Sequence, residues 1–332
     1  MVELDGTDLV FRFPDTHADA ECRVSFQRTL RIPDDNRDHP LPPSFGRFPM
    51  RHVEDLGAGL PEAVARRGGV ILPMYQAEAL WIDFDHGYPG YPVAIRIGAG
   101  KINVVTGEPW RDELAEDRED FVVVPGQPWL DGFSTGEGLV RQFVAMPLGA
   151  GYTAEEQLTG EGVHGGLQIA VHPMKSERYE VWKRAQEECL SVETRLCTSA
   201  CLTSEMGLAP GGLMRQAIYR SDLDFDVWET DVSSRCFVHL LNSERWKAVT
   251  GDPVPTPPVT AADYTRAGLP WFEYFDESRT AVAGSPELAG LDSVAALGIK
   301  KGESPLPENE PVGPQTTIRL HASGTSVSDG RW

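Results

Sequence analysis

Short runs in which apolar and polar residues alternate recur along the first 173 residues of the chain. Alternation with a period of two is typical of β-strands with one buried face. Gly, Pro and Asp interrupt these runs about every 8–12 residues, a spacing typical of sandwiches and barrels rather than of βαβ units. The predicted strands lie at residues 9–13, 23–26, 28–32, 70–73, 79–84, 93–97, 102–105, 121–124, 139–146 and 167–172.

Helical spacing replaces this pattern after residue 175. Tyr179, Trp182, Gln186 and Cys189 recur on one face and predict a helix from residue 176 to about 190. Strand-like segments return at 213–219 and 236–241, and a last one is expected at 316–321. Helix-capping residues predict short helices at 62–67 (between Pro61 and Gly68), 153–160 (capping box of Thr153 and Glu156), 243–251 (Ser243 as cap), 261–267 (Thr260 as cap) and 285–298.

These elements together predict an α+β, β-rich protein. Its antiparallel sheets are expected to form a sandwich or a barrel-like arrangement, with a few short peripheral helices. The change of pattern divides the chain into a β-rich part at 1–174, a helical connector at 175–205 and an α+β part at 206–332 packed on the first.

Composition narrows the classes of partner. The chain has 30 basic and 50 acidic residues, which gives a net charge of −20 and argues against nucleic acid as a partner. No apolar run approaches the roughly 20 residues of a membrane span. The first residues lack the features of a signal peptide, and the five cysteines are an odd number, so we expect a soluble cytoplasmic protein without a disulfide framework.

Motifs for phosphate, dinucleotide, metal or nucleophilic chemistry are not found. The sequence has no Gly-rich phosphate loop between a strand and a helix, no G-x-S-x-G and no H-E-x-x-H. No cofactor and no metal site is therefore predicted.

Several predicted strands have a polar face. On 167–172, Gln168 and His172 share one face, opposite the apolar residues of the strand. Arg141 and Arg215 lie on similar strands. A polar strand face is either exposed to solvent or the wall of a pocket. The second interpretation predicts a hydrolase- or lyase-type enzyme in which His172 or His239 is the base and Arg141 or Arg215 holds an anionic group.

His239 follows Cys236 in an apolar segment, where the two side chains of a strand point to opposite faces and cannot form a nucleophilic pair. The simplest interpretation is a histidine satisfied within the core. A metal-assisted reaction would need His172 and His239 to meet a carboxylate such as Asp131 or Asp226.

Three tryptophans follow proline in loop-like segments. They are Trp110, Trp129, which is close to Asp131, and Trp271. Rigid loop tryptophans suit the binding of a glycan, a peptide or a partner protein. Because no catalytic motif is present, we favour a binding or assembly protein that holds a small molecule, a glycan or a protein through these loops. The enzyme described above is the alternative.

Overall fold

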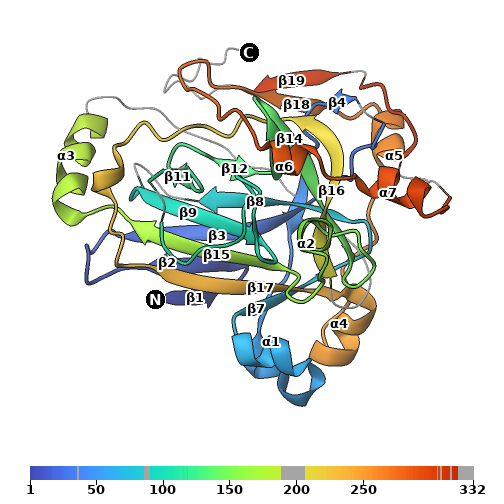
Figure 1. Cartoon of the computed structure of the whole chain (residues 1–332), viewed down its shortest axis with the longest axis horizontal. Coiled ribbons are helices and arrows are strands. Elements are labelled where there is room, and N and C mark those ends of the chain that lie inside the picture. The colour runs from blue at the N-terminus through green and yellow to red at the C-terminus, as the bar shows by residue number, and fades with distance from the viewer. Residues whose placement is uncertain are drawn as a thin grey trace, which may run out of the picture.

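The structure is a computed structural model that describes residues 1–320 except 36, 86–89, 115, 118, 188–205, 305, 307–308 and 315. Strands make up 37% of it and helices 19%, and most strand pairs are antiparallel (Figure 1). The sheet does not close into a barrel. The predicted β-rich class with a few short helices is confirmed, whereas the barrel-like alternative is wrong.

In the part of the chain that the structure describes, seventeen strands are linked into one hydrogen-bonded network, and two more form a separate pair. The strands of the network are β1 (Val2–Asp5), β2 (Asp8–Arg12), β3 (Glu21–Thr29), β4 (Asp38–His39), β5 (Ser44–Arg47), β6 (Arg51–His52), β7 (Val70–Met74), β8 (Ala79–Asp85), β9 (Val93–Ala99), β10 (Ile102–Asn103), β11 (Val122–Val124), β12 (Trp129–Leu130), β13 (Gly132–Gly136), β14 (Leu139–Pro147), β15 (Leu167–Pro173), β16 (Met206–Arg215) and β17 (Ser234–Asn242). The separate pair is β18 (Trp271–Tyr274) and β19 (Thr317–Leu320).

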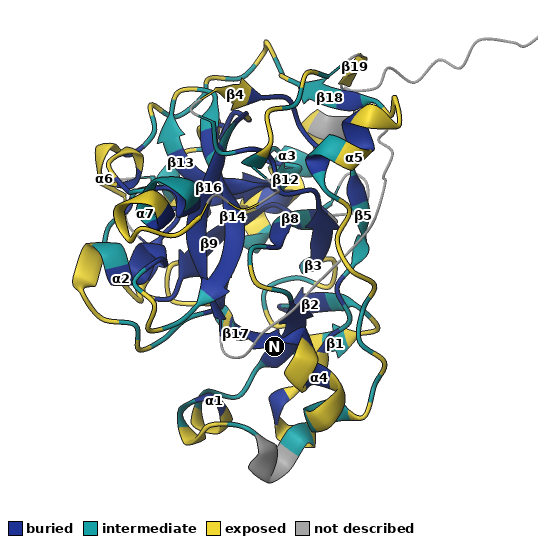
Figure 2. Cartoon of the chain, turned by 90° about the vertical axis from the view of Figure 1, so that its right-hand side faces the viewer, coloured by how far each residue is buried: buried dark blue, intermediate teal, exposed yellow. Residues whose placement is uncertain are grey.

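Short helices lie around the sheet, with their exposed faces outward in Figure 2. Within the described ranges, the α-helices are α1 (Glu62–Arg67), α2 (Ala154–Thr159), α3 (Ser176–Glu187), α4 (Ser243–Thr250), α5 (Ala261–Arg266), α6 (Pro286–Ala289) and α7 (Val294–Lys300). They are accompanied by the 3₁₀ helices η1 (Val53–Gly59) and η2 (Phe225–Val227).

The two halves of the chain share this network. From the C-terminal half, β17 pairs with β15 and β7, and β16 pairs with β14 and β4. The pairs β17–β7 and β16–β4 are parallel, and each joins segments that are far apart in the sequence.

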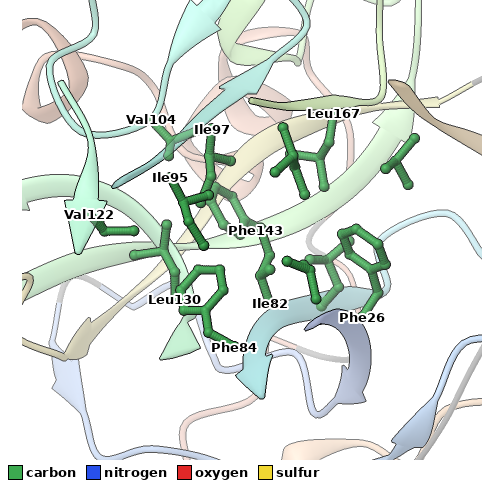
Figure 3. Packing of buried hydrophobic residues seen from close by; sticks show 14 of the residues in the cluster. Phe26, Ile82, Phe84, Ile95, Ile97, Val104, Val122, Leu130, Phe143 and Leu167 are labelled. Atoms are coloured by element: carbon green, nitrogen blue, oxygen red, sulfur yellow. The ribbon is translucent and has the colours of Figure 1, made fainter. Parts of the chain in front are cut away.

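The core fills one face of these strands. Alternate residues of β9, β14 and β15 pack together with Phe26, Ile82 and Leu130 from β3, β8 and β12 (Figure 3). Leu167, Ile169 and Val171 belong to this cluster, which confirms the predicted alternation in β15. The opposite face of β15 is therefore available for polar side chains.

Some predicted elements lie elsewhere. The strand expected at 213–219 spans Met206–Arg215 instead. Of the strand expected at 28–32, only the first two residues are strand, at the end of the longer β3, and residues 30–32 are not. The helix expected at 285–298 is divided into α6 and α7, and Asn242, rather than Ser243, caps α4. Residues 188–205 of the predicted connector lie outside the described part of the chain. No helix in the described ranges is long and apolar enough to span a membrane.

Candidate functional site

Three neighbouring strands place polar and aromatic side chains on one sheet face. In the antiparallel register, Gln168 of β15 lies opposite Gly98 of β9 on one side and Phe237 of β17 on the other. Trp110, in the segment after β10, covers Gly98. A Cβ atom at Gly98 would lie 2.8 Å from Cε3 of Trp110, so only glycine lets the indole approach the sheet this closely.

A cavity of about 310 Å³ opens over this face. Its volume is at the lower end of the range for small-molecule sites, roughly 300–1,000 Å³. The walls come from the end of α1, the β9–β10 turn, the segment before β15, and β15 and β17. The lining residues are Arg67, Gly100, Lys101, Trp110, Asp112, His164, Gly165, Leu167, Gln168, Arg235, Phe237 and His239.

The hydrogen bonds of His164 fix its tautomer. Arg67 Nη1 donates to the His164 carbonyl at 3.1 Å, and Nη2 lies 2.6 Å from His164 Nδ1. Because a guanidinium only donates, Nδ1 must accept and the proton of neutral His164 is on Nε2. Burial lowers the pKa of His164. The Glu155 carboxylate works against this, but the positive charges of Arg67 and Lys101 lower the pKa further.

His239 has the same tautomer, but its hydrogen bond is made by the other ring nitrogen. Its Nε2 lies 3.0 Å from the carbonyl oxygen of Gly68, so Nε2 donates and Nδ1 is unprotonated in the neutral ring. Nδ1 has no hydrogen-bond partner among the residues that the structure describes. Burial lowers the pKa of His239, and nearby Arg67 lowers it further. The pocket therefore holds a neutral imidazole with an available proton acceptor.

The opposite wall is a chain of contacts through Asp112. The Trp110 indole donates to Asp112 Oδ1 at 3.2 Å, and Arg235 donates to the same oxygen. Burial works to raise the pKa of Asp112, but these two donors outweigh it and the pKa is lowered. Arg235 also lies over the Phe237 ring, with its Cζ 5.3 Å from the centroid.

The charge of the pocket is opposite to that of the whole molecule. Arg67, Lys101 and Arg235 contribute three positive charges and Asp112 one negative charge, in a chain whose net charge is −20. Arg67 and Lys101 form no ion pair with any carboxylate in the described ranges. An acidic protein that gathers unpaired cations in one cavity has a site suited to an anion.

Three of the residues singled out from the sequence line this pocket: Trp110, Gln168 and His239. The amide of Gln168 donates to the Gly100 carbonyl at 2.7 Å and so fixes the β9–β10 turn that carries Lys101.

The two arginines expected to hold an anion lie elsewhere. Arg141 on β14 donates to the Gly211 carbonyl and lies 3.8 Å from Asp34. Arg215 on β16 forms ion pairs with Asp38 and Glu273. Arg141 and Arg215 do not line the pocket around His239, so the expected grouping of these arginines with that histidine is wrong.

His172 shares the polar face of β15 with Gln168, as predicted, but it is only 1% exposed. The register places it about six residues from His239 along β17, or roughly 20 Å. The two histidines therefore cannot share a metal ion or a reacting atom. The structure, over the residues it describes, has no group of three His, Cys, Asp or Glu side chains that could hold a metal ion.

The three loop tryptophans do not form one surface. Trp271 is fully buried and donates to Thr265 at 3.1 Å. Trp129 is half-buried between Trp81 and Tyr274, and its indole donates to Asp131 Oδ2 at 2.6 Å. Only Trp110 lines the pocket.

The cations and one histidine of the site were not among the residues selected from the sequence. Arg67, Lys101 and His164 lie at the ends of elements, where polar residues are common and carry no periodic signal. The chain has only six lysines, and this rarity is the one feature of the sequence that could have drawn attention to Lys101. Comparison of the chain with family models, with curated proteins and with solved structures finds no match.

Proposed function

We propose that this protein binds a small anionic molecule in the cavity between α1, β15 and β17. The observation that carries the proposal is the set of three cations in one concave site of an acidic chain. The indole of Trp110 and the ring of Phe237 supply apolar walls, so the ligand combines an anionic group with a planar or apolar part.

Calorimetric titration with inorganic phosphate and with phenyl phosphate tests the proposal. Both should bind, and phenyl phosphate should bind more tightly because of the aromatic walls. R235Q and K101M should each weaken binding about tenfold, the cost of one charge-assisted contact. K300M is the matched control, since Lys300 is an exposed lysine paired with Asp292 outside the pocket. Equal binding by all four proteins, or none by wild type, would overturn the proposal.

An enzyme is the second candidate, favoured by one observation: His239 presents an unprotonated Nδ1 beside the proposed anion site. Such a group is suited to accept a proton from a water molecule as the water attacks a bound anionic ester and the alcohol or phenol leaves. A screen of hydrolysable anionic esters, beginning with p-nitrophenyl phosphate, should then find turnover in wild type that H239Q lacks. Turnover that is equal in both proteins would remove His239 from this role.

The sheet arrangement and a buried thiol support two further parts of the proposal, the architecture of the scaffold and the compartment of the protein. The scaffold is interpreted as an open sandwich whose polar face carries the site. The thiol of Cys236 is free and buried, which supports a reducing compartment such as the cytoplasm.

A further inference from the structure

The sheet face that floors the pocket continues behind Trp110 into a fully buried polar region. Arg96 of β9 is 0% exposed and His172 of β15 is 1% exposed. Arg96 lies opposite Ala170 in the register, so His172, two residues further on, is its diagonal neighbour on the same face. The Cβ atoms of such a pair are about 7 Å apart.

Each of these two side chains has one nitrogen without a hydrogen-bond partner. Arg96 Nη1 and His172 Nε2 are both inaccessible to solvent and unpaired within the described structure. The other groups are occupied: Arg96 Nε and Nη2 lie 3.0 and 2.9 Å from Asp120 Oδ2, and His172 Nδ1 lies 3.3 Å from the Glu229 carbonyl. Buried polar atoms in native proteins are nearly always paired, with protein, water or a ligand.

The two orphaned atoms are chemically complementary. Arg96 Nη1 donates, whereas His172 Nε2 accepts, because the Nδ1 proton is directed to the Glu229 carbonyl. A carboxylic acid satisfies both atoms, since its carbonyl oxygen accepts and its hydroxyl donates. The same arrangement after proton transfer is a carboxylate between a guanidinium and an imidazolium.

We infer that Arg96 and His172 form an inner site that takes a carboxylate together with one proton, reached from the pocket past Trp110. This inference rests on the proposed function, because the pocket cations attract the anion to that entrance. Trp110 lies between the two regions: it lines the pocket with one part of its ring, and the Arg96 guanidinium lies 4.7 Å from its centroid. The ligand of the pocket is then a carboxylic acid whose acid group is anchored behind the indole.

The charges around His172 favour this coupled uptake. Arg96 and Asp120 neutralise each other, and burial lowers the pKa of His172, so the empty inner site has no net charge. Among the residues that the structure describes, the remaining charged groups near this face are Arg235 on β17, its partner Asp112, and Glu229. An incoming carboxylate therefore finds no spare positive charge until His172 gains its proton from solvent.

Calorimetry with formate in buffers of different ionisation enthalpy tests the inference on the whole chain. Near neutral pH, about one proton should be taken up for each formate bound, and the affinity should fall about tenfold for each pH unit above neutrality. H172Q should abolish the proton uptake. K300M, at an exposed lysine paired with Asp292 outside the pocket, should retain it.

Nitrogen NMR of wild-type protein labelled at histidine gives a readout that needs no variant. On adding formate, Nε2 of His172 should change from an unprotonated to a protonated signal. An unchanged signal would mean that only water occupies the inner site. If phosphate binds but formate leaves His172 unchanged, the inference is wrong and the proposed function stands. If neither anion binds, both are wrong.

Discussion

Arg67 donates two hydrogen bonds to His164, one to its carbonyl oxygen and one to its Nδ1. This pair joins the end of α1 to the segment that leads into β15. It also places a fixed positive charge beside a neutral imidazole, and Arg67 lowers the pKa of both His164 and His239. The pocket therefore changes charge with pH through its histidines.

We expect sulfate to bind more tightly as the pH falls from 8 to 5.5. The pKa values of His164 and His239 lie below 6.5, so both rings are neutral at pH 8 and gain positive charge on acidification. Sulfate does not titrate in this range, and a gain of about tenfold is expected if one proton is taken up near the anion. Calorimetry across the range measures it.

H239Q should show a smaller increase, whereas H52Q, at an exposed histidine outside the pocket, should follow wild type. Acidification should strengthen sulfate binding, but it should lower the free energy of unfolding of the protein without sulfate. Because the folded-state pKa values are depressed, the contribution of these histidines is present above about pH 6.5 and is lost as the pH falls. Sulfate should therefore raise the melting temperature more at pH 5.5 than at pH 8. A sulfate affinity that is independent of pH would contradict this.

G98A should disturb the wall of the pocket without straining the backbone. The added Cβ would lie 2.8 Å from Trp110 Cε3 and 3.0 Å from Gln168 Cγ, which forces the indole outward. We expect a loss of about 1–3 kcal/mol in the free energy of unfolding, as for other overpacked sites, and weaker binding of phenyl phosphate. Urea unfolding and calorimetry measure the two effects.

The control is G136A, at a strand glycine where the nearest atoms to a new Cβ are 3.7 Å away. It should be close to neutral. In the W110A background, G98A should cost less than it does alone, because the colliding ring is gone. Additive costs would show that Trp110 is not the obstacle.

D131N should change how stability depends on pH. Asp131 is 3% exposed, and burial raises its pKa to about 7 although the Trp129 indole works against this. Its folded-state pKa lies above the unfolded-state value of about 3.9. The contribution of Asp131 to the free energy of unfolding is therefore fully present below about pH 3.9 and is lost as the pH rises through 7. The loss amounts to up to about 4 kcal/mol.

Asparagine keeps an acceptor for Trp129 and does not ionise. The free energy of unfolding of D131N, taken relative to that of wild type, should therefore be higher at pH 8 than at pH 5. Urea unfolding at both pH values measures this difference. D15N, at an exposed aspartate, should show the same difference from wild type at both pH values. An equal difference for D131N would mean that Asp131 titrates normally.

The sequence predicted best what is determined locally. The capping box of Thr153 and Glu156 and the left-handed Gly160 define α2 within one short segment, and all three are confirmed. The polar face of β15 follows from alternation alone. β16 was misplaced because its limits are determined by pairing with β14, whose paired residues lie 59 to 76 positions away in the sequence.

The same reason explains which part of the site was missed. Arg67 reaches His239 only because β7, which follows α1, pairs in parallel with β17. No periodicity within either segment encodes that pairing. Gln168 and His239 could be selected because each lies within a strand, whereas Lys101 depends on a turn that Gln168 stabilises from another strand.

G69A should be far more damaging than its backbone conformation alone predicts. Gly69 joins α1 to β7, next to the Gly68 carbonyl that holds His239. Its φ is +90°, and an added Cβ would lie 2.2 Å from the Phe237 carbonyl oxygen.

G6A is the matched control, because Gly6 has a φ of +62° and no atom within 4 Å of the new Cβ. A left-handed alanine costs about 1–2 kcal/mol, so G6A should lose only that much stability in urea. G69A adds a collision with backbone that cannot move without separating β7 from β17, and it should lose at least twice as much. It should also lose sulfate binding under conditions where it remains folded, because His239 and Arg67 are displaced together. Equal losses in G6A and G69A would show that the close approach of Gly69 to β17 does not determine the geometry of the pocket.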